Sequence, residues 1–352
     1  MKPDQNRMTG IKDIAEVLGI SIGTVDRALH ARPGVSPVTR AKVLAVAEKL
    51  RYKPNIAARS LKLSRSLRIA VYLPEEIASY FDPIRAGIQA AAAATTGVLI
   101  TLDFRNYLRL GEGVQSLLEK DLAKNYDGII VVPGNPRQID PILRKFDERG
   151  TAIVCLSSDA PNSPHLVTVC ADAYACGCIA AELLTISLGQ RGSVAVITGS
   201  LKVQNHAEKV RGFAATLAVM APRLQLLAVV ESHDQTKVAY RETAALLKQN
   251  PGLNGLYIST ANSISVMQAI EDHGSLGRIR VVATDLFPEL ISQIESGNVL
   301  ATIHQRPFTQ GKVAFESLLR FLTERTRPKS SITRLAPHIV LRSNLSLFSD
   351  PM

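Results

Sequence analysis

Residues 9–30 read TGIKDIAEVLGISIGTVDRALH. In the first half of this stretch, apolar side chains recur at the spacing of one helix face: Ile11, Ile14, Ala15 and Leu18. Thr9 is placed to cap this helix, and Gly19 ends it at a position where the left-handed conformation costs little. A second short helix follows at once. Two short amphipathic helices joined by a tight turn are typical of a helix-turn-helix, whose second helix lies in the major groove of DNA.

The two following helices are expected to begin at serines. Ser21 caps the second helix, whose inward face is formed by Val25, Ala28 and Leu29 and whose outward face is formed by Ile22, Gly23, Asp26, Arg27 and His30. Ser36 caps a third helix, since Pro37 fits the first helical position. The apolar stripe expected on this third helix is Val43, Leu44, Ala47 and Leu50. An all-α head over residues 1–54 is therefore predicted.

Positive charge is concentrated in this head. Residues 1–66 contain thirteen Lys or Arg and five Asp or Glu, a net charge of +8 out of +10 for the whole chain. The rest of the chain contributes only +2. A basic head on a nearly neutral body favours binding of nucleic-acid phosphates by the head alone.

The body alternates short apolar strands with helical patterns. Strands are expected at 68–73, 97–103, 127–132, 152–156, 193–198, 226–231, 255–259 and 280–284, with a helix near 81–95 after the first. Almost wholly apolar strands between helices indicate parallel sheets covered on both faces. So many units predict two doubly wound lobes, with a cleft where the carboxyl ends of the strands converge.

Composition and motifs exclude several classes of protein. The N-terminus shows no apolar signal-peptide core, and the apolar stretch 86–100 is too short to cross a bilayer, so we expect a cytoplasmic chain with no membrane partner. The cysteines lack a zinc-ligand pattern and are expected to be reduced thiols: Cys155, Cys170, Cys176 and Cys178. Neither a cofactor nor a metal is expected. No phosphate loop or nucleophile elbow indicates an enzyme.

Together these features resemble the lactose repressor (LacI/GalR) family. The motifs that carry the resemblance are Ile11-Lys-Asp-Ile-Ala, Ser21-x-x-Thr-Val, Arg27-Ala-Leu, Thr39-Arg and Tyr52-x-Pro-Asn-x-x-Ala-Arg-Ser-Leu61. The resemblance covers essentially the whole chain. It implies a repressor with a lambda-repressor-like helix-turn-helix head, a hinge helix and linker at 55–66, and a periplasmic-binding-protein-like α/β core at 67–352. It also implies a homodimer on a pseudo-palindromic operator, under allosteric control by a small molecule.

The resemblance also implies which residues contact DNA. Ser21, Thr24 and Arg27 match positions that contact phosphates or bases, and Ile22 and Gly23 match positions that discriminate between operators. The hinge residues that match are Asn55, Arg59, Leu61 and Lys62. In the family this hinge folds only on DNA, and its leucine wedges into a central base step through the minor groove.

Two of these positions keep alternatives open. Asp26 stands where many family members have Ser. It accepts from a cytosine amino group, pairs with Arg27 or His30, or faces solvent as the i,i+4 partner of His30 with no base contact. Leu61 is either the wedge or a core contact in a permanent helix.

The core resembles the ribose-type periplasmic sugar-binding proteins. This implies a first lobe of about 67–170 and 305–333 and a second lobe of about 171–304 and 334–352. Tyr80 and Phe81 stand where these proteins place an aromatic ring against the sugar, unless they are ordinary aromatics at a helix start. Asn262, Asp285 and Gln305 match residues that bind ligand hydroxyls. A carboxylate and two amides at strand ends suit a polyol.

Two matches to the family fail. Lys209 stands where Arg is common, and Ser157 and Ser158 displace the frequent aspartate to Asp159. Lys209, Asp159 and His206 are further pocket candidates. The implied effector is a small sugar or polyol; the alternatives are a purine or other non-sugar metabolite, and a role in sugar transport, which the DNA-binding head opposes. The absence of a leucine-rich heptad tail after Leu345 favours a dimer over a tetramer.

Overall fold

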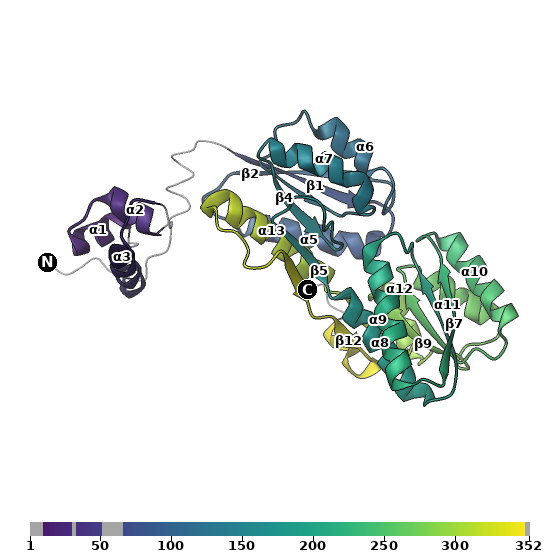
Figure 1. Ribbon diagram of the computed structural model, residues 1–352. Helices are drawn as coiled ribbons and strands as arrows, with labels where there is room; N and C mark the ends of the chain where they lie inside the picture. Colours follow the sequence, from purple (N-terminus) through teal and green to yellow (C-terminus); the bar gives the residue numbers. More distant parts are fainter. Residues whose placement is uncertain (1–9, 30–32, 51–65, 349–352) are drawn as a thin grey trace. The chain divides into compact units, whose positions relative to one another are not determined.

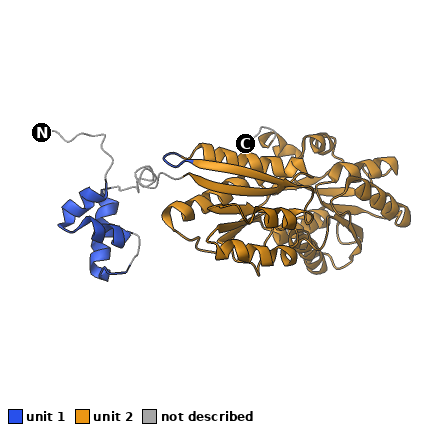
Figure 2. Ribbon diagram, turned by 90° about the horizontal axis from the view of Figure 1, so that it is seen from above, with its two compact units in different colours: residues 1–65, 96–99 blue, residues 66–95, 100–352 orange. Residues whose placement is uncertain are grey.

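The computed structural model describes residues 10–29, 33–50 and 66–348. The chain forms two compact units, coloured in Figure 2. One unit comprises residues 1–65 and 96–99, and the other comprises residues 66–95 and 100–352. The first contains the helical head and the second contains the α/β core.

The head consists of three helices in its described part: α1 (Ile11–Leu18), α2 (Ile22–Leu29) and α3 (Pro37–Lys49). Their buried faces share one small core, formed by Ile14, Ala15, Val25, Ala28, Val43 and Ala47. The helix-turn-helix predicted from the spacing of apolar residues is therefore confirmed.

The turn and caps of the head follow the sequence with two corrections. Gly19 ends α1 in the left-handed conformation (φ 63°), and the hydroxyl of Ser36 accepts from the N–H of Thr39 at 3.1 Å, as expected. The N-cap of α1 is Gly10 rather than Thr9, which lies outside the described residues. Leu44 is 49% exposed and is not part of the core stripe. Its place on α3 turns it away from the face that packs on α1 and α2.

Lobe 1 of the core is a parallel sheet with the strand order β11-β5-β4-β3-β1-β2. Its strands are β1 (Leu67–Pro74), β2 (Ile100–Tyr107), β3 (Gly128–Val131), β4 (Ala152–Leu156), β5 (Val167–Ala171) and β11 (Ile332–Leu335). Helices α5 (Ala78–Ala93) and α13 (Pro307–Glu324) cover one face, and α6 (Val114–Asp121) and α7 (Pro136–Glu148) cover the other (Figure 1).

Lobe 2 repeats this plan with the strand order β12-β10-β9-β8-β6-β7, in which only β12 runs antiparallel to its neighbour. Its strands are β6 (Gly192–Thr198), β7 (Leu224–Glu231), β8 (Gly255–Ser259), β9 (Arg280–Thr284), β10 (Ala301–His304) and β12 (His338–Val340). Helices α8 (Ala173–Leu188) and α9 (Gln204–Met220) cover one face. The other face is covered by α10 (Thr236–Gln249), α11 (Ser263–Asp272), α12 (Pro288–Glu295) and the 3-10 turn η1 (Arg342–Leu347).

The two doubly wound lobes predicted from the alternation are confirmed, with shifted details. Within residues 66–348 the chain passes between the lobes after β5, after β10 and after β11. The expected boundary between residues 333 and 334 falls inside β11, so the last crossing comes after Leu335. The strand expected at 97–103 begins only at Ile100. Strands β10, β11 and β12 are three or four residues long, too short for periodicity to mark them.

Glycines allow two helix pairs to pack closely. A Cβ added to Gly87 on α5 would lie 2.0 Å from the carbonyl oxygen of Phe308 on α13. A Cβ added to Gly177 on α8 would lie 1.9 Å from the carbonyl oxygen of Lys209 on α9. Both contacts are to backbone, which cannot rotate away. These glycines therefore fix the distance between the helices that carry the residues of the cleft.

We predict that Gly87→Ala destabilises the core by on the order of 1–3 kcal/mol, since α5 and α13 must separate to accept the methyl group. Urea unfolding followed by circular dichroism measures this. Gly252→Ala is the matched control, because a Cβ there meets nothing within 4 Å. Equal unfolding free energies for the two variants would show that the helix pair tolerates the added carbon.

Candidate functional site

The outward face of α2 carries the residues expected to read DNA. Ile22 is 48% exposed, and Gly23 and Arg27 are also exposed, whereas Thr24 and Asp26 are half-buried. The guanidinium Nε of Arg27 donates to the carbonyl oxygen of Gly23 at 3.1 Å. This bond holds the Arg27 side chain along the helix surface, with its remaining donors available for a partner.

The side chain of Ser21 caps the N-terminus of α2. Its hydroxyl accepts from the N–H of Thr24 at 3.1 Å and lies 2.9 Å from the Thr24 hydroxyl. The expected cap is therefore confirmed. The other expected DNA contacts, His30, Asn55, Arg59, Leu61 and Lys62, lie outside the described residues.

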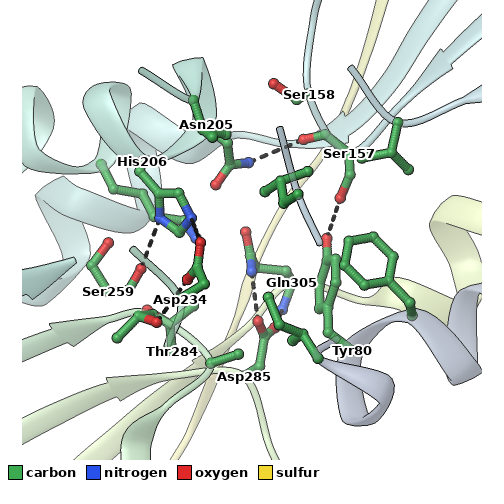
Figure 3. Close-up of a pocket in the computed structure, with 18 residues that line it drawn as sticks. Tyr80, Ser157, Ser158, Asn205, His206, Asp234, Ser259, Thr284, Asp285 and Gln305 are labelled. Carbon is green, nitrogen blue, oxygen red and sulfur yellow. Dashed lines mark hydrogen bonds and ion pairs between the residues drawn. The ribbon is translucent and has the colours of Figure 1, made fainter. Parts of the chain in front are cut away.

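A pocket lined by residues of both lobes lies between the two lobes of the core. Lobe 1 contributes the start of α5 and the end of β4, and lobe 2 contributes the start of α9 and the ends of β7, β8 and β9 (Figure 3). Gln305, directly after β10, also lines the pocket. Six of the residues expected in the pocket line it: Tyr80, Phe81, His206, Lys209, Asp285 and Gln305.

Asp285 is the buried carboxylate at the end of β9, 4% exposed. Its Oδ2 accepts from the side-chain amide of Gln305 at 2.7 Å, and its Oδ1 accepts from the Gln305 backbone N–H at 3.2 Å. Burial raises the pKa of Asp285 above its ordinary value, against the attraction of Lys209 and these two hydrogen bonds. The carboxylate is therefore incompletely compensated and suits further hydrogen-bond donors.

A histidine–aspartate pair, His206 and Asp234, lines the same pocket, and the sequence analysis did not predict Asp234. Nε2 of His206 lies 3.3 Å from Oδ2 of Asp234, and Nδ1 of His206 lies 3.1 Å from the carbonyl oxygen of Ser259. Both partners accept hydrogen bonds, so a ring nitrogen that carries a proton donates it to the protein here. Burial alone would raise the pKa of Asp234, but His206 and the hydroxyl of Thr260, 2.9 Å away, lower it overall.

Lys209 adds a cation to the same pocket. Its side chain is buried, 3% exposed, and its charge acts on both Asp285 and Asp234. Among the described residues, no hydrogen bond or ion pair within 4.0 Å holds its ammonium group. The ammonium therefore remains able to donate to a ligand.

Hydrogen bonds connect Asp285 to the far wall of the pocket. The Gln310 amide, on α13, donates to the Gln305 carbonyl oxygen at 2.8 Å and to the Tyr80 hydroxyl at 3.1 Å. Tyr80 in turn lies 2.6 Å from the hydroxyl of Ser157, and the Ser157 carbonyl oxygen accepts from the Asn205 amide at 3.1 Å. Because Asn205 is on lobe 2 and Ser157 on lobe 1, this last bond joins the lobes directly (Figure 3).

Two aromatic residues at the start of α5, Tyr80 and Phe81, line the pocket together. The rings of Tyr80 and Phe81 meet edge to face, with centroids 5.0 Å apart and an angle of 86°. Burial raises the pKa of Tyr80, so its hydroxyl stays protonated in the network. The pair forms one apolar wall of the pocket, and both residues are nearly fully buried.

Backbone strain gathers at the pocket. Seven non-glycine residues in the described part have positive φ, and four of them line it: Ile77, Ser157, Asp234 and Asp285. Such conformations cost on the order of 1–3 kcal/mol each and persist where the surroundings enforce them. Their concentration here is typical of a binding site rather than of a structural core.

Two expected pocket residues do not line this pocket. Asn262 lies beside it, with its Oδ1 accepting from the Thr236 hydroxyl at 3.3 Å. Asp159 faces a second groove, where it accepts from the Ala160 N–H at 2.8 Å and from the Thr168 hydroxyl. Both polar groups are occupied by the protein itself.

The lining suits a ligand that both donates and accepts hydrogen bonds. Within the described residues there is no group of three or more His, Cys, Asp or Glu placed to hold a metal ion. A search of the same residues finds no helix long and apolar enough to cross a bilayer. The pocket offers charged and amide groups around an aromatic wall, an arrangement for binding.

Two family models match different parts of the chain. Residues 69–326 match the family described as periplasmic binding protein domain. Residues 10–55 match the family described as bacterial regulatory proteins, lacI family.

Two curated relatives match over nearly their whole length. Catabolite control protein A from Priestia megaterium is 25% identical over 341 residues, covering 95% of this chain and 98% of the relative. The HTH-type transcriptional repressor PurR from Erwinia tasmaniensis is 26% identical over 349 residues, covering 96% and 97%.

Solved structures match the core. GanP, a glucose-galactose binding protein from Geobacillus stearothermophilus, has a TM-score of 0.73 and 24% identity, covering 80% of this chain and 99% of its own. A solute binding protein from Burkholderia graminis in complex with D-arabinose has a TM-score of 0.74 and 22% identity, covering 81% and 98%. These similarities show the fold of the core.

We predict that Asp285→Asn stabilises the ligand-free protein at neutral pH, because burial raises the pKa of the aspartate and so penalises its charged form. The pKa of Asp285 is raised by folding, so its contribution is most favourable below the unfolded value, about 3.9, and is lost as pH rises through the folded value. The amide stays neutral throughout. Urea unfolding at a series of pH values tests the sign: the variant's advantage should shrink toward acid, and a less stable variant at neutral pH contradicts it.

Proposed function

We propose that a small sugar or polyol bound between the lobes controls the operator affinity of this chain, which belongs to the family of periplasmic binding protein domains and carries the DNA-binding domain of the lacI family of bacterial regulatory proteins. The chain is a DNA-binding transcription regulator with a ligand-binding core. The proposal concerns the class of ligand and the way in which its binding is transmitted.

The observation that carries the proposal is the buried pair Asp285–Gln305. The carboxylate has a raised pKa, and Oε1 of Gln305 is buried without a hydrogen-bond partner among the described residues. A hydroxyl can donate to either oxygen and accept from the Lys209 ammonium at the same time. Adjacent hydroxyls on one ligand could therefore bond to the Asp285 carboxylate, the Gln305 side-chain oxygen and the Lys209 ammonium group.

The charge balance of the pocket supports an uncharged ligand. Two carboxylates, Asp234 and Asp285, already face the ammonium group of Lys209 and the imidazole ring of His206. A ligand with a net charge would add a further charge to these buried groups, which is costly unless that charge is paired. Tyr80 and Phe81 supply the apolar wall for the C–H face of a sugar ring or cyclitol.

Ligand binding would act by holding the lobes together. Asp285 belongs to lobe 2, and Gln305 lies on the crossing to α13 in lobe 1. A ligand changes DNA affinity only by the difference in its affinity for the two lobe arrangements. Filling the pocket would favour the arrangement in which Asn205 donates to Ser157, and lobe 1 would pass this change to the head.

Several finer points belong to the same proposal. The chain acts as a cytoplasmic homodimeric repressor on a pseudo-palindromic operator, by binding rather than by catalysis. α2 reads the major groove with Arg27, and hinge residues Asn55, Arg59, Leu61 and Lys62 contact the minor groove, with Leu61 as the wedge. The exposed face of α2 and the net charge of +8 within residues 1–66 support this assignment.

We predict that Arg27→Ala weakens specific DNA binding by on the order of 1–3 kcal/mol and relaxes one operator position in each half-site. Selection from a randomised duplex pool, followed by binding titrations, measures both effects. Lys42→Ala is the control, since it removes an exposed charge from α3 rather than α2 and should weaken all sequences alike. An unchanged sequence preference in the Arg27 variant would remove Arg27 from base readout.

We predict that Asp285→Asn abolishes stabilisation by the effector. A thermal-shift panel of pentoses, hexoses, inositols and purines identifies the ligand, which at 100 times its Kd adds about 2.7 kcal/mol to the unfolding free energy of the wild type. Calorimetry then compares Asp285→Asn with Asp159→Asn, the same change outside the pocket. Wild-type affinity in the Asp285 variant, or a response to purines alone, would contradict the assignment.

A further inference from the structure

A group of exposed cations lies at the end of lobe 1 away from the ligand pocket. Residues 320–334 contain five Lys or Arg and a single acid, Glu324. Four of these cations, on the last turns of α13 and in the loop that follows it, form what we call the basic rim: Arg320, Arg325, Arg327 and Lys329. All four are exposed.

Two arginines of the basic rim are held on an aromatic ring rather than on a carboxylate. The guanidinium groups of Arg325 and Arg327 both lie over the ring of Phe321, 5.5 and 5.4 Å from its centroid. Within the described residues, no carboxylate lies within 4.0 Å of any rim cation, whereas the neighbouring Arg334 has Asp172 at 3.9 Å. Two guanidinium groups held on one ring repel each other, and an anion placed beside them would relieve that repulsion.

The topology places the rim where the chain from the head enters lobe 1. α13 starts at the crossing beside the ligand pocket and packs along α5 and the sheet, so it ends at the opposite edge (Figure 1). The loop after it leads into β11, which is parallel to β5 and therefore begins at that same edge. β1 also begins there, at Leu67, directly after the residues that connect to the head.

We propose that the basic rim binds phosphate groups of duplex DNA that flank the sequence bound by the head. DNA is the polyanion that this regulator binds, and Arg forks and Lys match phosphate oxygens. The fifteen residues 51–65 can span at most about 50 Å, so bound DNA stays at high effective concentration around this edge. An acidic protein would satisfy the charge equally well, but nothing tethers one to this edge.

The test uses the full chain and the highest-affinity duplex recovered by selection from a random pool. Binding is titrated over a range of salt concentrations, on the duplex trimmed to the selected site and on the same site with about one helical turn added at each end. The variant is Arg325→Gln/Arg327→Gln/Lys329→Gln. The matched control, Arg191→Gln/Arg223→Gln/Lys248→Gln, removes three exposed cations from the corresponding edge of lobe 2.

On the flanked duplex, the slope of log affinity against log salt should fall in magnitude by about 0.9 for each phosphate that the rim variant no longer neutralises, hence by about 2 or more in total. The control should keep the wild-type slope, and the trimmed duplex should not distinguish the proteins. Thr326→Lys, which adds a cation inside the rim, should steepen the slope. A rim variant with the wild-type slope on flanked DNA and an unchanged unfolding midpoint would overturn the proposal and leave an acidic protein as the partner.

Discussion

The cleft of the core is organised around one buried carboxylate, that of Asp285, to which the described part of the protein donates only two hydrogen bonds. Asp285 ends β9 in lobe 2, and its two hydrogen bonds come from Gln305, on the crossing to lobe 1. Burial makes its charge costly, and the nearby Lys209 compensates it only through space. From Gln305 the contacts continue through Gln310 and Tyr80 to the bond between the lobes. A ligand that donates hydrogen bonds to Asp285 therefore binds to one end of a hydrogen-bond network whose other end joins the two lobes.

The pocket and the basic rim lie at opposite edges of lobe 1, and rigid elements join them. The strands of lobe 1 are parallel, so the edge where they end faces the ligand and the edge where they begin receives the chain from the DNA-binding head. The close approach of α5 and α13 at Gly87 leaves little freedom for one helix to slide on the other. Most of the strained residues lie at the pocket, as expected where stability is given up for binding.

Local sequence pattern predicted what depends on local structure, and missed what depends on distant contacts. The apolar spacing in residues 11–29 and the alternation of strands and helices sufficed for the head and the two lobes, because burial follows periodicity. Asp285 and Gln305 could be predicted, because they are polar residues at strand ends that match the family's ligand-binding positions. Asp234 could not, because it lies in the loop after β7 and its partner His206 comes from α9, which is distant in sequence. Asn262 was expected in the pocket, but its carbonyl oxygen accepts from Thr236. Gln310 gave no signal either, since nothing in a helical pattern shows that one amide reaches two elements.

The most direct test of the account is the distance between the lobes with and without effector. Spin labels at Arg137 and Lys237, exposed at the starts of α7 and α10, report the opening of the cleft in a background with the partly exposed Cys170 and Cys178 replaced by Ser. The account predicts that the sugar or polyol giving the largest thermal stabilisation shifts a broad distance distribution to a single shorter distance, and that operator affinity changes over the same range of ligand concentration. Identical distance distributions at zero and saturating ligand would contradict it.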